Sequence, residues 1–172
     1  MIKETIQAAI NRQISMEFAS AHAYLAMAAY FEDRNLTGFA HWYRVQAGEE
    51  IGHAMKFFNY LTDRNGRALL SGLPEPQNEF GSPLDAAQAA LGHEQKVTAS
   101  ITAIYELAGR EGDPATQSFL QWFLDEQVEE EKNADEIIQH LKLVGNEGVG
   151  LYLLDRQLAT RPGVGLGEGA AE

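Results

Sequence analysis

The chain has 172 residues, 45% of them hydrophobic, which is enough for a single domain whose core needs no disulfide or structural metal. It contains no cysteine, so a bound metal has to be held by carboxylate, imidazole, amide or phenol groups, and these favour harder ions. The formal net charge of -12 argues against nucleic acid and anionic membranes as partners, because both attract clusters of Lys and Arg. An acidic surface suits a protein that attracts cations, and it also serves solubility.

The N-terminal segment MIKETIQAAINRQ has no apolar signal-peptide centre and enters helical periodicity directly. No run in the chain approaches the ~20 apolar residues that cross a bilayer. We therefore expect a cytoplasmic protein with no membrane-spanning segment.

Two long helical patterns come first along the chain. The first covers about residues 3–33 and has apolar side chains at helical spacing, namely Ile6, Ile10, Ile14, Ala21, Leu25 and Ala28. The second covers about residues 37–64 and ends at Asn65-Gly66, a usual C-terminal pair. Because the turn between them is short, the two helices are expected to be antiparallel neighbours.

Residues 65–82, NGRALLSGLPEPQNEFGS, are rich in Gly and Pro and have no sustained period, which predicts a long connection. Most connections in compact domains are ~4–6 residues long, so this one needs a structural reason. When extended it reaches about 60 Å, whereas a helix of about 28 residues is about 42 Å long. The connection can therefore cross the whole length of a helical bundle.

The third and fourth helices begin in the same way. Ser82 and Pro83 form the N-cap and first position of one helix, and Asp113 and Pro114 repeat the arrangement for the next. The two patterns end near residues 109 and 144, and a glycine marks each end.

The C-terminal part predicts one more short element. Residues 148–161, GVGLYLLDRQLATR, predict a short fifth helix, and the Gly-rich acidic residues 163–172 predict a disordered tail. The sequence thus predicts one all-α domain, residues 1–162. Its fold is a four-helix bundle with a long crossover between helices two and three and a short fifth C-terminal helix.

Each of the four long helices interrupts its apolar stripe with residue types that bind metals. On the first helix, Glu17 lies on the face of Ile10 and Ile14. Tyr24 lies two turns further on, in nearly the same direction. The interruptions on the other helices are Glu50 and His53, then Glu94, then Gln127 and Glu130. All of them are expected to point inward.

These residues also fall at matching levels. Glu17 and His53 each lie 18 residues from the turn near residue 35. Glu94 and Glu130 each lie 18 residues from the turn near residue 112. Because the crossover makes the second and third helices parallel, both layers come near the middle of the bundle, and one central cluster is expected.

Four carboxylates buried together would each lose hydration and would repel one another unless something compensates. The inner stripes carry no Arg or Lys near the cluster, which leaves multivalent cations as the simplest compensation. Glu50 and His53 form an E-x-x-H step, an arrangement used in di-iron carboxylate bundles. A buried polar network, or protonated carboxyls that share hydrogen bonds, stays open as the alternative.

Four segments together make the chain resemble a ferritin. They are NRQISMEFASAHAYLAMA around Glu17 and Tyr24, RVQAGEEIGHAMKFF around Glu50 and His53, GHEQKVT around Glu94, and FLQWFLDEQVEEE around Gln127 and Glu130. The resemblance covers nearly the whole chain and is greatest to the non-haem prokaryotic ferritins. It implies a ferritin-like fold and a homo-oligomeric cage of 24 subunits for iron storage and detoxification. In such a protein, an intra-subunit ferroxidase site oxidises Fe(II) with O2 or H2O2, and the Fe(III) is stored as mineral.

The same resemblance implies a di-iron site. Its ligands would be Glu17, Glu50 and His53 for one iron, with Glu50 bridging to a second iron held by Glu94 and Glu130. Gln127 would be a supporting partner or weak ligand, and Tyr24 a hydrogen-bond or redox partner beside the site. Trp122 is a candidate electron donor, with core packing as the alternative.

A third iron site is implied by the match of Glu49, Glu126 and Glu129, with Glu130 shared, to the prokaryotic ferritins. A solvated acidic face is the alternative interpretation of DEQVEEE. No haem is expected, because Ile51 stands where the haem methionine of bacterioferritins would be. The remaining histidines, which include His93, lie off the inner stripe, and this predicts surface or subunit-contact roles.

Two other functions stay open from the residues alone. One is a non-catalytic bundle that holds Zn(II) or Mn(II). The other is a di-iron oxidase for organic substrates, for which the short chain has no evident substrate pocket or partner domain.

Overall fold

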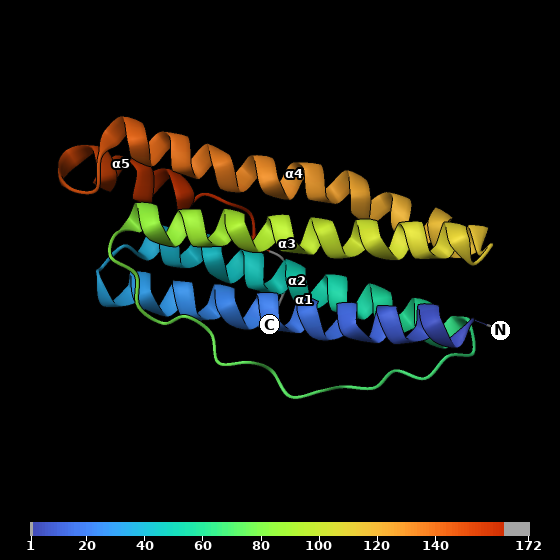
Figure 1. The fold of residues 1–172 in the computed structure, drawn as a ribbon. Helices are drawn as coiled ribbons and strands as arrows, with labels where there is room; N and C mark the ends of the chain where they lie inside the picture. The colour runs from blue at the N-terminus through green and yellow to red at the C-terminus, as the bar shows by residue number, and fades with distance from the viewer. Residues whose placement is uncertain (1, 164–172) are drawn as a thin grey trace, which may run out of the picture.

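The computed structural model describes residues 2–163, and this part of the chain contains five α-helices. They are α1 (Glu4–Asp33), α2 (Thr37–Asp63), α3 (Pro83–Arg110), α4 (Pro114–Val144) and α5 (Gly148–Leu158). The four long helices run side by side, and α5 folds back against one end of the bundle (Figure 1). The predicted four-helix bundle with a short fifth helix is confirmed, although α5 ends at Leu158 rather than at residue 161.

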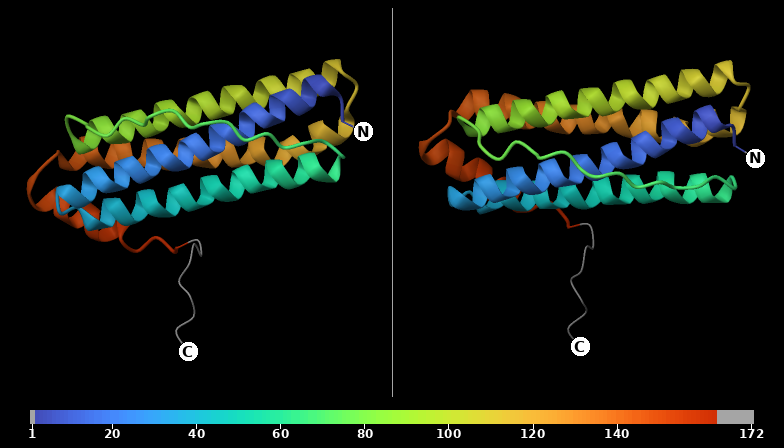
Figure 2. Two further views of the ribbon diagram at one scale, coloured as in Figure 1. Left: turned by 90° about the horizontal axis from the view of Figure 1, so that it is seen from below. Right: turned by 60° about the horizontal axis from the view of Figure 1, so that its bottom comes forward.

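The connection between α2 and α3 runs the length of the bundle (Figures 1 and 2). It returns the chain to the end at which α2 began, so α2 and α3 are parallel, as its length predicted. Arg67 N donates to Gln7 Oε1 at 2.9 Å, and Leu69 N donates to Asn11 Oδ1 at 2.7 Å. These bonds to α1 satisfy backbone groups of a segment that forms no helix or strand.

The helix ends follow the signals in the sequence. Ser82 Oγ accepts from Asp85 N at 3.1 Å, and Asp113 Oδ1 accepts from Thr116 N at 3.1 Å, each beside a Pro in the first turn. Asn65, which follows α2, has a φ of 57°, a left-handed conformation that Asn tolerates. These helix ends determine how far along the bundle axis each residue lies.

One carboxylate attaches α5 to the N-terminus of α2. The buried Asp155 accepts hydrogen bonds from Gly38 N at 2.8 Å and Phe39 N at 3.0 Å, which are donors without a partner inside α2. A Cβ at Gly38 would lie 1.7 Å from Asp155 O, so this close approach requires glycine. The N-terminal cap of α2 is therefore supplied by a residue 117 positions away.

The core consists of two apolar clusters with a polar layer between them. One cluster includes Phe31, Phe39, Tyr43 and Leu141, and the other includes Ile10, Phe57, Ile101 and Leu120. The polar layer comprises Gln13, Glu17, Ser20, Gln46, Glu50, His53, Glu94, Gln127 and Glu130, all buried. The apolar clusters on both sides keep this layer away from the ends of the bundle.

Leu25 departs from the prediction that it belongs to the inner stripe, because it is 49% exposed. Eight residues at about 100° each turn its side chain about 80° away from that of Glu17. Tyr24, seven residues from Glu17, is buried.

The chain from residue 2 to residue 163 contains no helix that is both long and apolar enough to span a membrane. The tail predicted for residues 163–172 lies, beyond Gly163, outside the described residues.

Asp155→Ala removes the acceptor of two backbone N–H groups at the start of α2. We expect the free energy of unfolding to fall by about 1–2 kcal/mol, the usual effect of a lost N-cap. Urea denaturation followed by circular dichroism measures the change. The matched control is Arg156→Ala at an exposed position of the same helix, which should change stability by less than about 0.5 kcal/mol. Equal losses in the two variants would contradict the capping role.

Candidate metal centre

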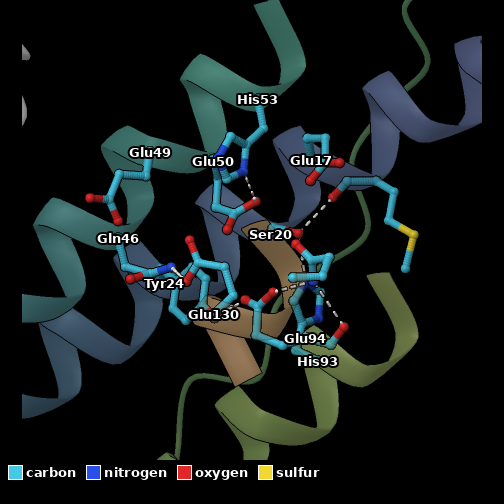
Figure 3. Close-up of polar contacts among 12 residues, drawn as sticks. Glu17, Ser20, Tyr24, Gln46, Glu49, Glu50, His53, His93, Glu94 and Glu130 are labelled. Carbon is cyan, nitrogen blue, oxygen red and sulfur yellow. Dashed lines mark hydrogen bonds and ion pairs between the residues drawn. The ribbon is translucent and has the colours of Figure 1, made fainter. Parts of the chain in front are cut away.

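Side chains from the four long helices meet in the polar layer (Figure 3). They are Glu17 from α1, Glu50 and His53 from α2, Glu94 from α3, and Gln127 and Glu130 from α4, each at most 5% exposed. A spacing of three residues puts both members of a pair on the same side of a helix, which explains the pairs on α2 and α4. These six side chains point inward, as the sequence predicted.

Glu17, Glu50 and His53 form a compact group. Each offers one potential ligand atom, and these atoms all lie within 4.8 Å of one another. His53 Nδ1 lies 3.6 Å from Glu50 Oε2. Among the described residues, Glu17 Oε2 and both Glu50 oxygens are buried and have no hydrogen-bond partner outside this carboxyl pair. Because buried polar atoms are nearly always bonded, these three oxygens are poised to accept a cation.

Glu94 is held in place from two sides. Tyr24 Oη donates to Glu94 Oε1, and Gln127 Nε2 donates to Glu94 Oε2 at 3.1 Å. Gln127 Nε2 also lies 3.2 Å from Thr98 Oγ1. Neutral donors therefore orient both oxygens of Glu94 and leave their other lone pairs free.

Glu130 belongs to a second group of potential ligands. His53, Glu126 and Glu130 offer atoms within 4.8 Å of one another, so the His53 ring stands between two candidate positions. Glu130 Oε2 accepts from Gln46 Nε2. Glu94 is in neither group, because its hydrogen bonds turn it toward Tyr24.

The carboxylates of the centre hold protons more tightly than ordinary carboxylates do. Burial raises the pKa of Glu17 and of Glu50 well above the usual range, and neighbouring carboxylates raise both further. Burial also raises the pKa of Glu94, although hydrogen bonds to its oxygens counteract the shift. Burial, and then the charge of Glu94, raise the pKa of Glu130 to about 7. At neutral pH these groups need either protons or cations.

The donor set fits multivalent cations. Within residues 2–163, no Lys or Arg side chain forms an ion pair with Glu17, Glu50, Glu94 or Glu130. Four carboxylates and one imidazole are ligands that divalent and trivalent iron accept, and a carboxylate can bridge two ions. The buried oxygens of Glu17 and Glu50 that lack another partner support the same conclusion.

The residues predicted for a third site do not converge in this structure. Glu49 points away from the centre (Figure 3), and its Oε2 accepts from Arg161 Nη2 at 2.6 Å. Glu126 joins one of the two ligand groups, whereas Glu129 is exposed. Ligation by all three residues stays a prediction, and it requires Glu49 to exchange its partner.

Two glutamines support the carboxylates and were not identified from the sequence. Gln13 Nε2 donates to Glu17 Oε1 at 2.8 Å, and Gln46 Nε2 donates to Glu130 Oε2. Both are completely buried polar residues on apolar stripes. The signal that identified Glu17 could therefore have identified them.

Two aromatic side chains lie beside the polar layer. His93 is partly buried, its Nε2 lies 2.6 Å from Ser20 Oγ, and its ring packs edge-on against Tyr24. It thus contacts the centre while part of its side chain stays exposed, and its predicted surface or subunit-contact role stays a prediction. Trp122 is 40% exposed, so it is not a core residue. Its ring centroid lies 5.6 Å from that of His53. Lys56 Nζ lies over the Trp122 ring, 2.9 Å from its centroid.

Glu130→Gln should make the stability of the metal-free protein less sensitive to pH. The folded-state pKa of Glu130, about 7, lies above its ordinary value of 4.5, so its contribution to stability is present at low pH and is lost as pH rises through 7. We expect the variant to gain on the wild type between pH 5 and 8, by on the order of 2–3 kcal/mol. Urea denaturation of the metal-free proteins measures this difference. A difference that is independent of pH would contradict the assignment of this titration to Glu130.

Comparison with known proteins gives one family. A family model described as a ferritin-like domain matches residues 7–144. A bacterial non-haem ferritin of Staphylococcus saprophyticus is 42% identical over 161 residues, which cover 94% of this chain and 96% of that protein. One of Staphylococcus aureus is 40% identical, with 94% and 97% covered.

The solved structures agree. An open-pore ferritin of the archaeon Archaeoglobus fulgidus matches with a TM-score of 0.93 and 44% identity, covering 94% of this chain and 100% of that one. An engineered closed form of the Archaeoglobus fulgidus ferritin gives a TM-score of 0.94, also at 44% identity, with 95% and 100% covered. Sequence, fold and the carboxylate–histidine centre therefore agree that the chain belongs to the ferritin family of iron-storage proteins, among the non-haem ferritins of bacteria and archaea.

Proposed function

We propose that the chain is a ferroxidase, which oxidises Fe(II) at the polar layer and stores the Fe(III) as mineral. The observation that supports this proposal most strongly is the group of three buried oxygens on Glu17 and Glu50 beside the His53 imidazole. Such oxygens are unfavourable in an apolar bundle unless a cation or proton binds them.

Iron is the substrate in this proposal, and two Fe(II) ions bind side by side. Glu17, Glu50 and His53 hold one ion, and Glu50 bridges to a second ion held by Glu94 and Glu130. The second position requires Glu94 to turn one oxygen from its Tyr24 contact, or to use a remaining lone pair. Gln127 keeps the Glu94 carboxylate in place through its 3.1 Å bond.

The pair of ions matches the electron count of the reaction. Two Fe(II) ions give one electron each to O2, which takes up two protons and leaves as H2O2. With H2O2 as the oxidant, two Fe(II) ions and two protons give two molecules of water. Carboxylate ligands stabilise Fe(III) more than Fe(II), so the anionic ligand set favours the oxidation.

A third iron ion is proposed at Glu49, Glu126 and Glu129, with Glu130 shared. Two observations support it: potential ligand atoms of Glu126, Glu130 and His53 lie within 4.8 Å of one another, and the charge of Glu126 raises the pKa of Glu49. An ion there would lie beside the di-iron pair on the side of α2 that faces α5. It would provide one more electron close to the reacting ions.

Self-association into a cage of 24 subunits is part of the proposal, and family membership supports it. Exposed apolar side chains on α1 and the crossover support an interface, namely Leu25, Leu69, Leu70 and Leu73, which are 45–66% exposed. Surfaces of this kind mark interaction sites. The enclosed volume of a cage would hold the mineral.

The double variant Glu50→Ala with His53→Ala tests the reaction. We expect a folded bundle whose initial rate of Fe(II) oxidation is lower by at least about 100-fold, because both the proposed bridging carboxylate and the imidazole of the proposed ligand set are gone. Oxygen uptake and absorbance of Fe(III) measure the rate. The matched control is Glu136→Ala with His140→Ala on α4, outside the polar layer. A wild-type rate in the first variant would overturn the assignment, and oxygen uptake no faster than without protein in the wild type would indicate a non-redox metal protein.

A second double variant, Glu49→Ala with Glu126→Ala, tests the third ion. We expect one iron fewer bound per chain under anaerobic conditions and a changed ratio of iron oxidised to oxygen consumed, because an electron donor near the pair is lost. Anaerobic equilibrium dialysis and an oxygen electrode give the two quantities. If both the count and the ratio stay as in the wild type, no iron binds at these residues.

A further inference from the structure

Arg161 follows α5 and reaches along one face of α2. Its Nη1 lies 2.8 Å from Gln46 Oε1 and 3.5 Å from Trp42 O, and its Nη2 lies 2.6 Å from Glu49 Oε2. Trp42, Gln46 and Glu49 are spaced by four and three residues, so they form a continuous stripe on the helix. The guanidinium Cζ also lies 4.5 Å from the centroid of the Trp42 ring. One side chain thus contacts three successive turns of α2.

The backbone around Arg161 is attached to the same helix. His41 Nε2 lies 2.8 Å from Arg161 O, and Asp155, six residues earlier, caps α2. The side chain of Arg161 is only 19% exposed. Arg side chains are mostly solvated unless they are paired, so this position depends on its partners.

The partners of Arg161 connect it to the metal centre. Among the described residues, Arg161 is the cation that forms an ion pair with Glu49, and burial raises the pKa of Glu49 while Arg161 counteracts the shift. Gln46 accepts from Arg161 with its oxygen and donates to Glu130 with its nitrogen. Arg161 therefore pairs with Glu49, one predicted ligand of the third ion. It also orients Gln46, which donates to Glu130, another predicted ligand.

An iron ion and the Arg161 guanidinium cannot both occupy the position beside Glu49 Oε2. The guanidinium nitrogen lies 2.6 Å from Glu49 Oε2 and fills the space that a cation bound to this oxygen would need. A metal ion bound beside the guanidinium would also be repelled by its positive charge, and strongly so in a partly buried site. A neighbouring pocket of about 220 Å³ offers another place for the side chain. Its lining includes Arg161, Glu136 and His140, so the guanidinium could move to a second carboxylate.

We propose that Arg161 is a built-in counter-cation of Glu49, and that a cation binding at Glu49 displaces it and loosens residues 159–163 from α2. This inference rests on the proposed third site. Because linkage is reciprocal, the attachment of the C-terminal segment and the affinity of the third ion regulate each other. The segment after α5 then reports whether the third position is filled.

Zn2+ titration of the assembled full chain tests the competition without redox chemistry. Arg161→Ala should tighten the weakest class of Zn2+ sites by about 5- to 50-fold, because the ion no longer has to displace a side chain. Arg156→Ala, exposed on α5, removes the same charge from the same segment and should change this affinity less than twofold. Glu49→Gln should abolish that class of sites.

The outcomes separate the inference from the proposal on which it rests. If Glu49→Gln removes a class of sites but Arg161→Ala leaves its affinity unchanged or weakens it, the third site stands and the displacement is wrong. If Glu49→Gln leaves the number of Zn2+ ions unchanged, the third site itself is wrong, and the inference fails with it.

A spin label gives a second readout that does not depend on affinity. Because the chain has no cysteine, Gly163→Cys introduces a unique labelling site at an exposed position where a Cβ meets nothing within 4 Å. Saturating Zn2+ should increase the mobility of the label in the electron paramagnetic resonance spectrum, and Glu49→Gln should abolish this response. A label whose mobility is the same with and without Zn2+ would overturn the release of the segment.

Discussion

Glu17, Glu50, Glu94 and Glu130 lie in one buried layer, and the free energy of keeping four carboxylates there is the constraint on which the rest of the structure depends. In the absence of cations, burial raises the pKa of each of them, and repulsion within the layer raises the pKa of Glu17, Glu50 and Glu130 further, so the layer binds protons more readily. Neutral donors such as Tyr24, Gln13 and Gln46 orient the carboxylates without neutralising them. The fold thus concentrates unpaired negative groups at one place that suits cations, while the apolar clusters on either side provide the stability.

The position of this layer follows from helix register. In each helical hairpin the polar residues lie at matching distances along the sequence from the turn. The crossover makes α2 and α3 parallel and puts the two turns at opposite ends of the bundle (Figures 1 and 2). Ser82 and Asp113 fix where α3 and α4 begin, and Asp155 fixes how α5 sits on α2. A shift of one residue at any of these points would turn a ligand about 100° away from the centre. Capping residues far from the metal centre therefore determine its geometry.

The fold and the inward residues could be predicted because both depend on local signals. Helical periodicity, caps and a polar residue on an apolar stripe are all visible in the sequence, and the inward position of Glu17 or Glu94 follows from them. Leu25 was misplaced because its direction lies at the border of the stripe, where small rotations decide burial. The contacts of Arg161 and His93 could not be predicted, since they depend on how α5 and α3 pack against other helices. The third-site residues illustrate the same limit, because DEQVEEE gives their spacing but not that Glu49 pairs with Arg161.

The most direct test of the central claim is anomalous diffraction at the iron edge from crystals loaded with Fe(II) under anaerobic conditions. We expect two strong peaks per chain inside the polar layer, one bound by Glu17, Glu50 and His53, and the other by Glu50, Glu94 and Glu130. Peaks only at surface carboxylates, or a polar layer without iron at saturating Fe(II), would contradict the claim that buried carboxylates of this bundle exist to bind a pair of iron ions.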